Sequence, residues 1–147
     1  MIGVIGGGRC SPEIEEMALE VGALIAQRNA TLICGGLGGV MRAACMGAKS
    51  KNGETIGVLP GYRKDEANPH VDIPIVTGLA DARNIIVVRS SDAVIAIDGK
   101  DGTLSEISFC FICDVPVIGL KSWAFDPRII QANTPKEAVD KAFSLLA

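Results

Sequence analysis

Aromatic residues and histidine are scarce in this sequence. The 147 residues include one Trp, one Tyr, four Phe and one His, whereas glycine occurs 17 times. A core with so few rings must be aliphatic and packed close to a glycine-rich backbone, which suits α/β proteins. Because His70 is the lone histidine, a histidine-rich metal site is excluded.

Long hydrophobic runs and an excess of basic charge are also lacking. No apolar run reaches the roughly 18 residues of a membrane-spanning helix, and Met1–Ile5 begins a strand directly, without a basic leader segment. We therefore expect a cytoplasmic protein with no membrane partner. The formal net charge of −3 and the pI near 5.1 argue against a general nucleic-acid surface.

The five cysteines, an odd number, lie in apolar or glycine-rich surroundings. This favours reduced core thiols over a disulfide framework. The pair Cys110-x-x-Cys113 invites a redox or zinc interpretation, but it lies late in an apolar helix and no second ligand pair accompanies it. We expect these thiols to be buried packing and predict no metal site.

Strand-like runs alternate with helix-like stretches along the chain. This alternation predicts a Rossmann-like three-layer α/β fold with a mainly parallel central sheet, in a single domain spanning residues 1–147. Residues 60–70 are polar and rich in helix breakers, and we expect a solvated loop at the rim of the ligand crevice. The predicted strands are Ile2–Ile5, Thr31–Cys34, Thr55–Leu59, Ile73–Val76, Ala93–Ile97 and Val115–Gly119.

Two helices have clear start signals. Ser11 is the expected N-cap of the first, and Thr134 caps a terminal helix that we predict to continue through Ala147. The helical segment 107–112 is apolar nearly all round, which one face of a sheet cannot cover. A subunit interface would cover the remainder, so we expect a homodimer or a higher homo-oligomer.

Glycine clusters follow three of the predicted strands. Because the C-terminal ends of parallel strands meet at one edge of the sheet, these clusters let backbone N–H groups approach a shared ligand. The third cluster also begins a helix, where free N–H groups and the helix dipole attract an anion, typically phosphate. Any single cluster could instead be a tight turn with no ligand role. Thr103, in the third cluster, could cap the helix as well as bind phosphate. The predicted ligand or phosphate contacts are Gly7, Gly8, Arg9, Gly35, Gly36, Gly38, Gly39, Gly99, Lys100, Gly102 and Thr103.

The clusters do not match the common nucleotide fingerprints. The dinucleotide motif G-x-G-x-x-G would require glycine or alanine in place of Ser11 and an acidic residue at the end of the second strand, where the sequence reads Cys34-Gly35-Gly36. The phosphate-loop motif G-x-x-x-x-G-K-[ST] is missing as well. A mononucleotide or another phosphorylated ligand is therefore favoured over NAD or a hydrolysed triphosphate.

Four motifs occur in an order that resembles a known superfamily: Gly35-Gly36-Leu37-Gly38-Gly39-Val40-Met41, Ile56-Gly57-Val58-Leu59-Pro60, Ala82-Arg83-Asn84 and Gly102-Thr103-Leu104-Ser105-Glu106. From Gly3 to about Gly119 the chain is similar to the LOG-type ribohydrolases and the molybdenum cofactor carrier proteins. Some members were once labelled lysine decarboxylases, and related Rossmann-like domains occur in DNA-processing proteins. The closer resemblance is to the carrier branch.

The resemblance implies roles for particular residues. In LOG-type enzymes the motif P-G-G-x-G-T-x-x-E supplies a carboxylate that acts with an arginine to cleave the N-glycosidic bond of nucleoside 5′-monophosphates. These roles would fall on Glu106 and Arg83. Here Asp98-Gly99-Lys100 replaces Pro-Gly-Gly, and Asn84, a further candidate ligand residue, replaces a lysine. Both departures weaken the enzyme interpretation.

We therefore expect a binding or carrier protein for a nucleoside monophosphate or a molybdopterin-type cofactor, with no cofactor required for catalysis. The alternative is a phosphoribohydrolase that uses Glu106 and Arg83 as catalytic residues. A DNA-handling role is a weaker third hypothesis, because the acidic pI opposes it. Two structural alternatives remain: Glu106 in the first turn of its helix could stabilise that helix through the dipole, and Arg83 could form a surface salt bridge.

Overall fold

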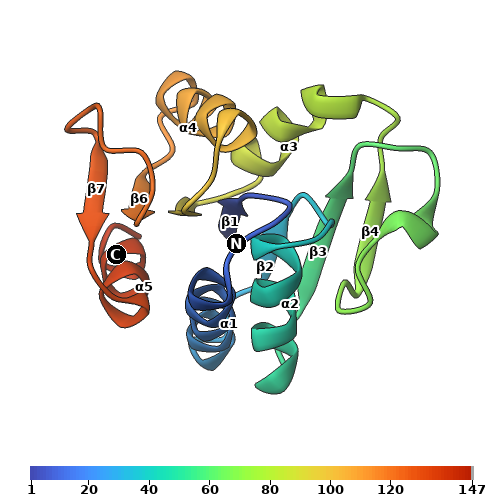
Figure 1. Ribbon diagram of the computed structural model, residues 1–147, viewed down its shortest axis with the longest axis horizontal. Coiled ribbons are helices and arrows are strands. Elements are labelled where there is room, and N and C mark those ends of the chain that lie inside the picture. The colour runs from blue at the N-terminus through green and yellow to red at the C-terminus, as the bar shows by residue number, and fades with distance from the viewer. Residues whose placement is uncertain (147) are drawn as a thin grey trace.

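The computed structural model describes residues 1–146 and shows a three-layer α/β arrangement (Figure 1). Over these residues a seven-stranded sheet runs in the order β4-β3-β2-β1-β5-β6-β7, with every pairing parallel. The predicted fold class is confirmed. The strands are β1 (Ile2–Gly6), β2 (Leu32–Cys34), β3 (Thr55–Leu59), β4 (Ile73–Val76), β5 (Ala93–Ile97), β6 (Val117–Leu120) and β7 (Ile129–Ala132).

Helices cover both faces of this sheet. In Figure 1, α1, α2 and α5 lie below the sheet and α3 and α4 above it, and each group buries its own aliphatic cluster. No helix in the described range is long and apolar enough to span a membrane. The α-helices are α1 (Pro12–Gln27), α2 (Val40–Ser50), α3 (Asn84–Arg89), α4 (Asp101–Ile112) and α5 (Pro135–Ser144), and the short 3₁₀ helices are η1 (Lys64–Glu66) and η2 (Ala80–Arg83).

Both predicted capping signals are confirmed. Ser11 Oγ accepts a hydrogen bond from the Ile14 N–H at 3.3 Å, and Thr134 caps α5 in the same way. Each cap satisfies an N–H group that has no acceptor within its helix, so these helices begin where the sequence indicates. The end of α5 was predicted wrongly: the helix stops at Ser144, and Ala147 lies outside the described residues.

Four strands differ from the prediction: β1 ends at Gly6 rather than Ile5, β2 begins at Leu32 rather than Thr31, and β6 and β7 differ further. β6 starts at Val117 rather than Val115, because the Val115 N–H bonds to the Cys110 carbonyl at 2.9 Å and closes the end of α4. β7 was not predicted at all, since the polar Gln131 interrupts the apolar run of Ile129–Ala132. Pairing with β6 at the sheet edge makes this segment a strand.

The order of the strands reverses between β1 and β5. From β1 the chain proceeds outward through β2 and β3 to β4, and from β5 it proceeds outward the other way to β7. Gly6 and Ile97, the last residues of β1 and β5, are register partners, so the turns that follow them emerge side by side. Ligands of open α/β sheets bind at such a reversal point, beyond the C-terminal ends of the strands.

Candidate functional site

A pocket of about 350 Å³ lies at this reversal point. Its walls come from the turn after β1, the loop between β2 and α2, the η2–α3 junction and the turn from β5 into α4. The volume is within the range of small-ligand sites. The lining residues are Gly6, Gly7, Gly8, Arg9, Leu37, Met41, Asp81, Arg83, Asn84, Asp98, Gly99, Lys100, Gly102, Thr103 and Glu106.

A broader hollow of about 470 Å³ runs along the outside of α5. Its charged side chains pair with one another along the helix, Lys136 with Asp140 and Lys141 with Glu137. Such exposed pairs contribute little free energy and leave no polar group in need of a ligand. We therefore assign no function to this surface.

Most of the predicted contact residues line the pocket. The four glycines between β2 and α2 do not, although that loop contributes two apolar residues, Leu37 and Met41. Sequence reasoning did not name the Leu37 and Met41 side chains or Asp81 as site residues, and it included Gly6 only as part of the first glycine turn. The signal for Leu37 and Met41 was available, because both lie within the glycine motif itself.

Close packing accounts for the glycines of the β2–α2 loop. A side chain at Gly39 would collide with the Gly7 carbonyl, and the Val40 N–H donates to that same carbonyl at 3.0 Å. Gly35 makes room for the Arg83 guanidinium, since a Cβ there would lie 2.7 Å from Nη2. In the structure these glycines allow the strand ends and Arg83 to come together, and their contact with a ligand stays a prediction.

The turn from β5 into α4 presents a helix start that no side chain caps. Asp98 and Gly99 have φ values of 50° and 102°, and α4 begins at Asp101 with Lys100 as its N-cap residue. The expectation that Thr103 caps the helix is therefore wrong, because Thr103 is the third residue of α4. Its side chain packs over Gly99 and is 3% exposed, and its hydroxyl has no hydrogen-bond partner within residues 1–146.

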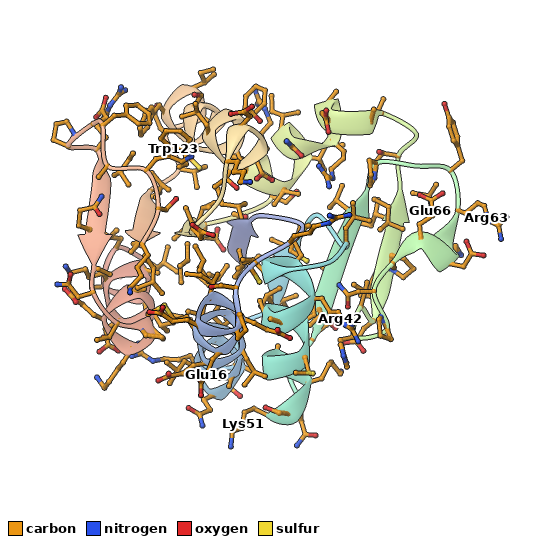
Figure 2. All side chains as sticks on the ribbon, viewed as in Figure 1. Glu16, Arg42, Lys51, Arg63, Glu66 and Trp123 are labelled. Carbon is orange, nitrogen blue, oxygen red and sulfur yellow. The ribbon has the colours of Figure 1, made fainter. Side chains whose placement is uncertain are left out.

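The segment after β6 holds this turn from outside. Ser122 Oγ donates to the Asp98 carbonyl at 2.6 Å, and Trp123 Nε1 donates to the Lys100 carbonyl at 3.2 Å. Figure 2 shows Trp123 beside α4. Sequence reasoning missed this contact, for which the only signal is the position of the single tryptophan just after a strand.

Glu106 lies in the second turn of α4, which corrects its expected place in the first turn, and is 7% exposed. Within the described residues its carboxylate makes no hydrogen bond, and no polar side-chain atom there is both sealed from solvent and unpaired. The Glu106 oxygens must therefore reach the pocket that this residue lines. Burial raises the pKa of Glu106 to about 7, and the charge of Arg83 opposes that rise.

Arg83 is buried rather than at the surface, which rules out the surface salt bridge. Its Nε donates to the Val58 carbonyl at 2.9 Å, its Nη2 to the Gly35 carbonyl at 3.5 Å, and its Nη1 to Asn84 Oδ1. The guanidinium has five N–H donors, so one on each terminal nitrogen is left for a ligand. Arg83 is thus fixed in orientation before any ligand arrives.

Asn84 is committed to protein partners on both sides of its amide. Its Oδ1 accepts from Arg83, and its Nδ2 donates to Ser105 Oγ at 3.2 Å. Ser105 Oγ in turn donates to the Gly102 carbonyl at 2.8 Å. These bonds connect Arg83 to the first turn of α4. Asn84 therefore holds Arg83 and this turn in position, and this structural role is clearer than a contact with a ligand.

The ionisable groups of the pocket nearly balance in charge. Among the described lining residues three are basic and three acidic, and protonation of Glu106 leaves the basic groups in excess. An excess of positive charge in a concave site attracts anions. The lining residues concerned are Arg9, Arg83, Lys100, Asp81, Asp98 and Glu106.

The other groups considered from the sequence are the cysteine pair, metal-ligating side chains and the loop of residues 60–70. Burial raises the pKa of Cys110 to about 12, so its thiol is inert packing, as predicted. No cluster of three metal-ligating side chains occurs between Met1 and Leu146. The loop of residues 60–70 supplies no pocket residue, but Asn68 Nδ2 anchors the β2–α2 loop through the Leu37 carbonyl at 2.9 Å.

The sequence matches the profile of the SLOG cluster4 family over residues 1–145. A protein of Archaeoglobus fulgidus is 45% identical over 97% of this chain and 94% of its own length. The cytokinin riboside 5′-monophosphate phosphoribohydrolase of Mycobacterium tuberculosis is 37% identical over 76% of this chain, and the match spans 64% of that enzyme.

Among solved structures, the molybdenum cofactor binding protein of Rippkaea orientalis superposes with a TM-score of 0.94 at 37% identity. The superposition covers 99% of this chain and 96% of that protein. DNA processing protein A of Helicobacter pylori, at 19% identity and a TM-score of 0.75, is similar in fold alone. The similarities support a function as a ligand-binding carrier or of the phosphoribohydrolase type.

Proposed function

The chain belongs to the SLOG cluster4 family, and from its pocket we infer that it binds and carries a phosphorylated, nucleotide-like ligand. The ligand is a nucleoside monophosphate or a molybdopterin-type compound, and its phosphate lies at the start of α4. We propose further that the chain forms one ligand-binding domain. The relatives described above support a small ligand of this kind, since one is named for a riboside 5′-monophosphate and another for binding the molybdenum cofactor.

The uncapped start of α4 is the observation that carries this proposal. Its first N–H groups have no side-chain acceptor, and the nearly buried Thr103 hydroxyl is unpaired beside them. Since no described polar side-chain atom is both sealed from solvent and unpaired, this hydroxyl opens into the pocket that Thr103 lines, where a ligand can complete its hydrogen bonds. A phosphate supplies acceptors to the N–H groups and to the hydroxyl at once, while Lys100 at the same turn adds positive charge.

The remaining lining residues are suited to the rest of such a ligand. Leu37 and Met41 offer an apolar wall to a flat ring, and Arg83 and Glu106 offer donors and acceptors to its polar edge. A molybdopterin-type cargo has this combination of phosphate and heterocyclic ring. Arg83, Glu106 and the start of α4 are the groups that would hold it.

The binding proposal is tested by identifying what the protein carries. Native mass spectrometry of freshly purified protein, followed by denaturation and phosphorus analysis of the released small molecule, should find a phosphorylated heterocycle. Titration calorimetry with adenosine and guanosine monophosphates provides a second arm. A released ligand without phosphate, or protein that binds no phosphate compound, would overturn the proposal.

A second candidate function, phosphoribohydrolase, is favoured by the environment of Glu106. A buried carboxylate with a pKa of about 7 is poised to accept a proton from water near neutral pH. The water oxygen would bond to the anomeric carbon as the bond to the base nitrogen breaks, and the proton taken up by Glu106 would pass to the leaving base, so that the products are free base and ribose 5-phosphate. Chromatography of adenosine monophosphate incubated with the protein tests this, and release that persists in Glu106→Ala would refute it.

The assembly of several copies also remains our proposal. Ile112, at the end of α4, is 68% exposed, whereas Phe111 is covered by Phe125 and Arg128 of the same chain. The chain itself thus covers part of the apolar surface for which the sequence predicted a subunit interface. Light scattering after size exclusion measures the state directly, and a monomer at micromolar concentration would contradict the proposal.

A further inference from the structure

The arrangement of Arg83 and Glu106 restricts the ring that the pocket accepts. The two side chains enter the pocket from different elements: Arg83 is anchored beside the ends of β2 and β3, and Glu106 projects from α4. They form no direct ion pair. Each therefore keeps hydrogen-bonding capacity that a ligand between them can use.

Their hydrogen-bonding capacities differ in kind. Arg83 has spare N–H donors at its two terminal nitrogens and no acceptor. Glu106, when ionised, has two acceptor oxygens and no donor, and no described residue donates to either oxygen. A ligand between them is complementary when it offers an acceptor to Arg83 and two adjacent donors to Glu106, which a ring edge with neighbouring N–H groups supplies and which a ribose diol would also offer to Glu106.

We propose that the pocket is specific for the 2-amino-4-oxopyrimidine edge shared by guanine and pterins, with Glu106 as the specificity-determining residue. Its ring N–H and its amino group would donate to the two Glu106 oxygens, and its oxo group would accept from Arg83. Leu37 and Met41 would pack against the ring, and the phosphate would lie at the start of α4. This inference rests on the proposed binding function.

Other heterocycles lack this pattern. Adenine presents an acceptor nitrogen where guanine has its ring N–H, so that nitrogen would face the Glu106 carboxylate without a proton between them. Hypoxanthine keeps the ring N–H and the oxo group but lacks the amino group, which leaves one carboxylate oxygen unpaired. A buried charged group without its partner is costly, so both bases are rejected.

Calorimetric titration with four nucleotides at about pH 8 tests the assignment. We expect guanosine monophosphate to bind at least about tenfold more tightly than inosine monophosphate, and at least about 100-fold more tightly than adenosine monophosphate. Deoxyguanosine monophosphate should bind within about threefold of guanosine monophosphate, because Glu106 faces the base edge and not the ribose hydroxyls. Dihydroneopterin monophosphate distinguishes the two sources of the edge, since tighter binding than guanosine monophosphate identifies a pterin and weaker binding a guanine nucleotide.

Glu106→Gln is the informative variant, because it keeps the size of the side chain and replaces one acceptor by a donor. It should lose the preference for guanosine over adenosine monophosphate while keeping its affinity for inorganic phosphate. Glu16→Gln, on the outer face of α1 in Figure 2, is the matched control and should keep the full preference. Unchanged tryptophan fluorescence establishes that each variant is folded.

Three results would overturn the inference, and they differ from failure of the proposed function. Equal binding of the guanosine, inosine and adenosine compounds would show a phosphate site that does not distinguish the ring edge. Strong loss with deoxyguanosine monophosphate, together with tight inosine binding, would place Glu106 on the ribose. A preference retained in Glu106→Gln would remove Glu106 as its origin. If no phosphate compound binds at all, the proposed function itself fails.

Discussion

Replacement of Glu106 by glutamine should make the ligand-free protein more stable at alkaline pH. The folded protein raises the pKa of this carboxyl from an ordinary 4.5 to about 7, chiefly by burial. Between these two values the unfolded chain is ionised while the folded protein still holds the proton. Stability is therefore highest when the group is protonated in both states, and it falls as the pH rises to about 7.

The magnitude follows from the two pKa values. At about 1.4 kcal/mol for each pH unit between them, the ionised carboxylate costs the folded protein about 3 kcal/mol above pH 7. Glutamine does not titrate, so Glu106→Gln avoids this cost. The stability advantage of the variant should be about 3 kcal/mol larger at about pH 8.5 than at about pH 4, or roughly 10 °C in Tm.

Urea unfolding monitored by the single tryptophan measures this difference. Other titrating groups contribute equally to both proteins, so they cancel when the variant is compared with the parent protein at each pH. Glu16→Gln, which changes an exposed carboxylate, should give the same stability difference at both pH values. If Glu106→Gln behaves as that control does, the carboxylate is not held at a buried, unpaired position and the proposed site geometry is wrong.

Three further variants test other parts of the site. Thr103→Val keeps the size of the side chain but removes the unpaired hydroxyl, so phosphate affinity in calorimetry should fall about tenfold with no loss of stability; equal affinity would remove Thr103 from the anion site. Asn84→Ala removes the hydrogen-bond partner of Arg83 Nη1 and of Ser105 Oγ. Because Arg83 lowers the pKa of Glu106, the midpoint of pH-dependent nucleotide binding should move in this variant, and Asn84→Gln should restore part of the parent profile. An unmoved midpoint would show that Asn84 does not position Arg83. Trp123→Phe removes the donor to the Lys100 carbonyl and should cost about 1 kcal/mol of unfolding free energy by circular dichroism; full retention of both stability and phosphate affinity would contradict its role at the turn.

The fold was predictable because its signals are local. Aliphatic runs such as Ala93–Ile97 are continuous, as expected for strands covered on both faces, and Ser11 begins α1 through a side-chain contact three residues away. β7 was not predictable, since its strand character depends on pairing with β6. A four-residue segment acquires that partner only when the whole sheet is assembled.

The candidate site was predictable in its position and less so in its contacts. The glycine turns after β1 and β5 lie at the pocket as expected, because parallel strands bring their C-terminal ends to one edge. Gly35 and Gly39 permit close packing, which depends on the Arg83 side chain and the Gly7 carbonyl that approach them from other parts of the chain. Local sequence carries no signal for such distant neighbours.

By itself the sequence determined the α/β class, the helix caps and the edge of the sheet at which the glycine turns gather, because these depend on the periodicity of apolar residues and on glycine near strand ends. Only the tertiary structure decided which polar groups need a ligand. Arg83, Asn84 and Glu106 are all buried, yet the first two find protein partners and Glu106 finds none. Burial and pairing depend on what distant segments place around a side chain, and they make Glu106 the residue on which the proposed ring specificity depends.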